Sequence, residues 1–214
     1  MRVARSSPTA GSRGATLVEF ALVLVLGVLP LLLGILQIAQ LLVAANVVNL
    51  ATFMATRQGS VNGADPASMR RELARGLVPL YVRAARDGLA TADSVASAYA
   101  LALLDVDTLD SLQVEHPTRA DLYRYGEQRA GQRVIPNDAI EFRPLAVQDA
   151  NVLTVAVIHC QPLVVPLAGP ALAAAISLLD ADPRHRPCLS TGRAPILARA
   201  SLVMQSDVRG EALK

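Results

Sequence analysis

The sequence predicts an α+β fold in which a long N-terminal transmembrane helix continues into an outer domain with about two further helices and a small antiparallel sheet. Two observations carry this prediction: an uncharged apolar segment near the N-terminus, and helical patterns that precede strand patterns along the rest of the chain. Charged residues make up 18% of the 214 residues, whereas about 25% is usual. This low charge excludes a largely disordered chain.

The apolar segment has the length of a membrane span. Phe20–Leu36 contains no polar side chain, and no charged residue follows Glu19 until Arg57. A bilayer core requires about 20 helical residues, which Leu17–Ala39 supplies. A removable signal peptide has an apolar core of only about 7–15 residues, so we expect a permanent single span.

Charge predicts the orientation of the span and excludes one class of partner. Three arginines and no acidic residue precede Glu19: Arg2, Arg5 and Arg13. The positive-inside rule therefore places the N-terminus in the cytoplasm and the rest of the chain outside, with membrane lipid as a partner. The whole chain carries a net charge of only +2 and no Trp, so we expect no nucleic-acid partner.

Glu19 lies at the N-terminal end of the apolar segment, where placing a carboxylate in the membrane costs free energy. Gly14 lies five residues upstream, after a leader rich in Arg and Ser, and the apolar run begins at Phe20. This arrangement resembles the N-terminus of type IV pilins and pseudopilins. The longer phrase from Arg13 to Gln37 resembles the TadE-like pseudopilins of the tight-adherence (Tad) pilus machinery.

The resemblance implies processing and a location. A prepilin peptidase would cut between Gly14 and Ala15, leaving a leader of residues 1–14, a transmembrane and extended helix of residues 15–58, and a periplasmic α+β domain of residues 59–214. The protein would cross the bacterial inner membrane once, with its N-terminus in the cytoplasm.

The resemblance also implies a role in assembly. Glu19, beside Phe20, would pair with the Ala15 ammonium of a neighbouring subunit, because pairing offsets the burial of both charges and sets the register between helices. The protein would be a minor pilin-like subunit, and not an enzyme. Its partners would be the prepilin peptidase, other pilin-like subunits and the pilus assembly platform.

Two alternatives remain open at this stage. A minor pseudopilin of a type II secretion system shares the cleavage motif. An uncleaved single-span envelope protein, with an outer domain that binds a partner, needs only the apolar span.

The outer domain shows helices first and strands later. The expected helices are Pro66–Arg86, Thr91–Asp105 and Pro170–Leu179, and the expected strands are a short one at Val114, then Ala139–Val147, Asn151–Cys160 and Ala194–Gln205. The first helix is rich in arginine, and we expect a solvated face.

One residue inside the span and several beyond it predict the shape and packing of the long helix. Pro30 should kink the helix or open its hydrogen bonding. One apolar stripe is expected to pack on the domain: Val43, Val47, Leu50 and Met54. A polar set is expected to face solvent: Asn46, Asn49, Thr52 and Thr56.

Cys160 and Cys188 both fall in the outer domain. In an oxidising periplasm we expect them to form a disulfide, which closes a loop of about 29 residues and contributes roughly 3–4 kcal/mol. Free buried thiols are one alternative. A zinc site with His159 and His185 is another, but the spacing matches no recognised zinc motif, and we expect no metal, no cofactor and no catalytic residue.

Overall fold

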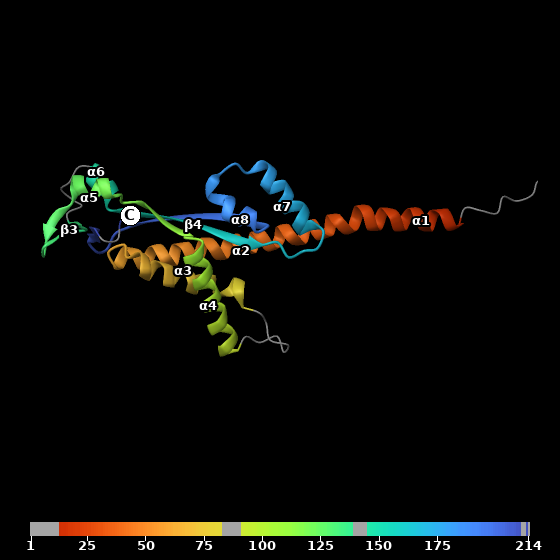
Figure 1. Cartoon of the computed structure of the whole chain (residues 1–214), viewed down its shortest axis with the longest axis horizontal. Helices are drawn as coiled ribbons and strands as arrows, with labels where there is room; N and C mark the ends of the chain where they lie inside the picture. The colour runs from red at the N-terminus through yellow and green to blue at the C-terminus, as the bar shows by residue number, and fades with distance from the viewer. Residues whose placement is uncertain (1–12, 83–90, 139–144, 211–212, 214) are drawn as a thin grey trace, which may run out of the picture.

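A computed structural model describes residues 13–82, 91–138, 145–210 and 213 and confirms the α+β class. A rod of helix is formed by α1 (Arg13–Val23), a π-helical turn η1 (Leu24–Val28) and α2 (Leu29–Val61). The other elements lie along the second part of α2, and α1 projects away from them (Figure 1). The helix ends at Val61, three residues beyond the expected end at residue 58.

The π-helical turn ends two residues before Pro30. Proline has no N–H to donate and its ring crowds the preceding turn. The chain widens here, and the Leu29 N–H donates to the Leu24 carbonyl, five residues back. The expected opening of the hydrogen bonding at Pro30 is therefore confirmed.

Two helices form successive layers on α2: the first packs against α2, and the second packs against the first. Helix α3 (Pro66–Tyr81) is capped at its N-terminus by Asp65, whose carboxylate accepts hydrogen bonds from the Ala67 and Ser68 N–H groups. Helix α4 (Ala92–Thr108) is capped at its N-terminus by Thr91 and packs on α3. Both were expected, although α3 ends five residues before the expected Arg86 and residues 83–90 are not described.

Two antiparallel sheets of three strands complete the domain. The larger sheet has the order β1-β4-β5 and the smaller one β2-β3-β6. Their strands are β1 (Leu112–His116), β2 (Glu127–Arg129), β3 (Gln132–Ile135), β4 (Val152–Pro162), β5 (Arg193–Val203) and β6 (Val208–Arg209). The remaining helices are α5 (Arg119–Tyr125), α6 (Leu145–Ala150), α7 (Ala168–Leu179), a 3₁₀ turn η2 (Pro183–His185) and α8 (Arg186–Ser190).

The expected strand Ala139–Val147 is wrong where the structure describes it. Residues 145–147 belong to helix α6, and residues 139–144 lie outside the described residues. A short apolar run fits a strand or a helical turn equally well. Strands β4 and β5 agree with the expected Asn151–Cys160 and Ala194–Gln205 to within two residues at each end.

The stripe expected to pack on the domain is wrong for two of its four members, while Val47 and Met54 are half-buried. Val43 and Leu50 are exposed, while the buried face of α2 consists of smaller side chains: Ala44, Val48, Ala51, Thr52, Ala55, Thr56 and Gly59. Thr52 and Thr56 were expected to face solvent. They can be buried because their hydroxyls donate to the carbonyls of Val48 and Thr52, each at 2.8 Å, which leaves no hydroxyl donor unpaired.

Small residues let α2 and α3 approach closely. A Cβ atom placed on Gly76 of α3 would lie 2.6 Å from the Cβ and 2.7 Å from the Cα of Ala51 on α2. This glycine therefore does not end α3. Its missing side chain makes room for the neighbouring helix.

Gly76→Ala is expected to lower the free energy of unfolding. Overpacking against a backbone costs about 1–3 kcal/mol, and the better helix propensity of Ala returns up to about 1 kcal/mol. The net loss of about 1–2 kcal/mol should lower Tm by roughly 2–8 °C. Thermal unfolding of the detergent-solubilised chain measures this change in Tm. Gly34→Ala is the matched control, because nothing lies within 4 Å of its Cβ position, and an equal loss in both variants would contradict the close-approach argument.

Candidate functional site

The N-terminal helix is exposed along its apolar part. Leu17–Val61 is long and apolar enough to cross a membrane, and most side chains from Leu17 to Leu36 are exposed. A soluble protein does not normally leave such a length of apolar helix in water. This part of the chain therefore has the character of a membrane anchor, a property that it shares with signal sequences.

Glu19 and Phe20 lie on α1, and both side chains are exposed. Phe20 is 68% exposed, and no side chain in the described ranges pairs with Glu19. Gly14 and Ala15 form part of the first turn of the same helix. Ala15 and Glu19 are four residues apart along this helix, which is about one turn.

An apolar surface continues from the span along the outer side of α2. We call it the outer stripe, and its members are Leu42, Val43, Leu50 and Phe53. They face away from the domain core, because α3 and the larger sheet cover the opposite side of α2. The outer stripe can pack against a helix of another chain.

The expected disulfide between Cys160 and Cys188 is present. Both cysteines are buried, and the bond ties the end of β4 to α8. It uses both sulfurs, so a zinc site with His159 and His185 is excluded. Among the described residues no group of three or more His, Cys, Asp or Glu side chains could hold a metal ion.

A half-buried polar cluster joins α3, α4 and the larger sheet. The Tyr81 hydroxyl donates to Asp105 Oδ2 at 2.5 Å, and Arg193 Nη1 donates to the same oxygen at 3.2 Å. The ring of His159 lies edge-on to Tyr81 with centroids 6.1 Å apart. Burial raises the pKa of Tyr81 and lowers the pKa of His159, so both are neutral at neutral pH. Sequence reasoning missed this cluster, whose contacts tie the helices to the sheet.

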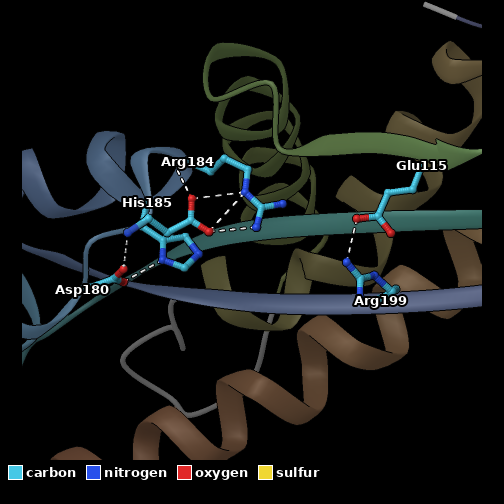
Figure 2. A network of polar contacts seen from close by, with 6 residues as sticks. Glu115, Asp180, Arg184, His185 and Arg199 are labelled. Atoms are coloured by element: carbon cyan, nitrogen blue, oxygen red, sulfur yellow. Dashed lines mark hydrogen bonds and ion pairs between the residues drawn. The ribbon is translucent and has the colours of Figure 1, made fainter.

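Further ion pairs lie around α7 and on the exposed face of the larger sheet (Figure 2). The Asp180 carboxylate is 2.6 Å from His185 Nδ1, and Asp182 pairs with Arg184 at 2.8 Å. The Arg184 guanidinium and backbone lower the pKa of Asp182 to about 2. These short-range contacts fold the chain back between α7 and α8.

The arginines of α3 are mostly engaged on the surface. Arg70 pairs with Asp110 at 2.6 Å, and Arg75 pairs with Glu72. Arg71 lines an open cleft of about 780 Å³ near the end of α2. Arg83 and Arg86 lie outside the described residues. The basic segment thus behaves as a paired, solvated surface in the part that the structure describes.

Comparison with known proteins finds no relative. No family model matches the chain, no curated protein matches its sequence and no solved structure matches its fold.

Proposed function

We propose that the protein is a minor pilin-like subunit of a Tad-type pilus, cut after Gly14 by a prepilin peptidase. The observation that carries this proposal is the spacing of Gly14 and Glu19 at the head of an exposed apolar helix. Gly14 precedes, and Glu19 lies at the start of, a span that is long enough to hold the chain in the bacterial inner membrane. The outer domain then lies in the periplasm, where its disulfide is stable.

The new N-terminus that cleavage creates gives a physical basis for assembly. Cleavage creates an ammonium at Ala15, one helical turn from the Glu19 carboxylate. Both charges are costly in lipid, and the cost falls when the carboxylate of one subunit meets the ammonium of the next. The outer stripe of α2 supports the same arrangement, because it continues the apolar surface of the span along an uncovered helix face.

The same features leave two competing functions. A minor pseudopilin of a type II secretion system would be processed in the same way and would differ in its partner subunits. An uncleaved envelope protein would keep its leader. The mature N-terminus separates the processed forms from the uncleaved form.

Processing is expected to yield a chain that starts at Ala15. Mass spectrometry of the N-terminal peptide from membranes of a host with an active prepilin peptidase measures this. Gly14→Leu should block or strongly slow cleavage, because the peptidase must approach the backbone closely at this bond. Gly27→Ala is the matched control and should be processed normally, since it lies well beyond the cut and nothing is within 4 Å of its Cβ position.

An intact N-terminus in the unsubstituted chain would overturn the proposal and favour the uncleaved envelope protein. Correct processing combined with co-purification of type II secretion subunits alone would favour that system over the Tad pilus.

A further inference from the structure

Helix α7 is apolar yet largely exposed. Ser177 is the only polar side chain between Ala168 and Leu179, and Gly169 is the only buried residue of this helix. Leu178 and Leu179 are 85% and 86% exposed. A helix that is apolar on all sides is normally covered by protein core or by lipid. Helix α7 rests on α2, α8 and β5 with one side only, where Leu172, Ala173 and Ile176 are half-buried, and the described part of the chain leaves its other side open.

The segment before α7 meets the long helix where its apolar run ends. Gln37 is the first polar side chain after Phe20–Leu36, and it is only 1% exposed. Its Oε1 accepts a hydrogen bond from the Val165 N–H at 3.0 Å. Residues around Val165 therefore lie at the same depth as Gln37, and the neighbouring Val164 is 67% exposed.

Figure 1 shows α7 at the end of the outer domain that is nearest to α1, beside α2. A bilayer that surrounds the apolar run would have its surface at this level. The uncovered leucines and valine would then meet the boundary between headgroups and acyl chains instead of water.

The charge distribution around α7 and the length of this helix fit a position at the membrane surface. No Asp, Glu, Lys or Arg occurs from Ala150 to Leu179. Charge returns directly after the helix, at Asp180 and Asp182, where the pairs of Figure 2 turn the chain back. With 12 residues, α7 is about 18 Å long and is too short to cross an apolar core of about 30 Å. An apolar segment of this length is either a buried core helix or an interfacial segment, and the exposed leucines of α7 fit the second.

We propose that α7 and the preceding segment Leu163–Leu167 form a second membrane contact, docked in the interfacial layer of the same bilayer that holds the N-terminal span. This inference rests on the membrane span of the proposed function. Two contacts on one side of the domain fix the rotation of the outer domain about the span. The hydrogen bond between Gln37 and Val165 joins the two contacts inside one chain.

The lack of tryptophan in the chain provides a direct test. We would reconstitute the full-length Leu178→Trp variant at low density into phosphatidylcholine vesicles, with or without bromine on the acyl chains. The tryptophan emission should be blue-shifted, and brominated lipid should remove roughly half of it or more, as expected for an interfacial side chain.

Two matched variants serve as controls. Leu32→Trp lies in the apolar run and should be quenched at least as strongly. Tyr123→Trp lies on α5, at the end of the domain far from α1 (Figure 1), and should not be quenched.

Absence of quenching at Leu178→Trp, with Leu32→Trp quenched, would overturn the α7 contact and leave the membrane span intact. If Leu32→Trp is not quenched either, the span itself fails and the inference fails with it. A blue shift at Leu178→Trp that grows with protein density and ignores bromine would mean that a second copy of the chain covers α7, which also overturns the lipid contact.

Discussion

Glu19→Ala is expected to abolish pilus assembly without lowering the amount of protein in the membrane. The apolar run after Glu19 is sufficient for insertion, and a carboxylate at its mouth opposes insertion by a few kcal/mol. Membrane levels of the variant should therefore be unchanged or higher. Assembly should fail, because the Ala15 ammonium of each neighbour would lose the charge that offsets its burial.

Two further variants separate charge from shape. Glu19→Gln keeps the size and hydrogen-bonding capacity of the side chain and removes the charge, so it should fail like Glu19→Ala. Glu19→Asp keeps the charge with a shorter reach and should be intermediate. Val18→Ala changes the adjacent exposed residue and should assemble normally.

The measurement combines a pull-down of partner pilin-like subunits with a membrane-fraction blot for each variant. Normal assembly of Glu19→Ala would mean that the carboxylate merely sits at the membrane surface, and the pilin-like mechanism would be wrong. Loss of the variant from the membrane would instead show that Glu19 acts in insertion or folding.

Features that depend on composition or on the local sequence could be predicted. The apolar run, the absence of charge from Phe20 to Thr56 and the largely apolar run Val152–Ile158 in β4 each follow from a short stretch of chain. The pairing of Cys160 with Cys188 could be predicted because the chain offers only two cysteines.

Features that depend on how elements meet could not be predicted. Helical periodicity favoured the large side chains of α2 as its packing face, yet small residues are needed where α2 and α3 approach as closely as Ala51 and Gly76 do. The large side chains then remain on the outer stripe. The β2–β3 hairpin was missed because its turn, Ala130–Gly131, offers only one glycine as a signal.

The candidate site shows the same difference between residues that the local sequence reveals and residues that only the fold brings together. Glu19 stood out because an acidic residue interrupts an apolar context within a few residues. The cluster of Tyr81, Asp105 and Arg193 gave no such signal, because its members come from three elements far apart in the sequence. The exposure of α7 also could not be predicted, since an apolar helix of this length in a domain is most often buried.

Loss of the disulfide is expected to destabilise the outer domain strongly. Cys160 and Cys188 are 28 residues apart, and in the chain-entropy model a crosslink over such a loop contributes roughly 3–4 kcal/mol. The loop has little core of its own, because Val165 and Gly169 are the only buried residues between the two cysteines. The crosslink is therefore the main tether of the segment that carries α7.

Reductant, or the double substitution Cys160→Ala with Cys188→Ala, should lower the free energy of unfolding in urea by that amount. It should also let trypsin cleave after Arg184, between the two cysteines, because the segment around this exposed residue loses its fixed conformation, while the bond after Arg199 in the middle of β5 stays protected. Adding reductant to the double variant is the control and should change nothing. Under non-reducing conditions the native protein should yield one linked peptide pair and no alkylated thiol. Recovery of two alkylated thiols, or an unchanged urea midpoint after reduction, would mean that packing against β4 and α8 holds the segment and that the crosslink does not.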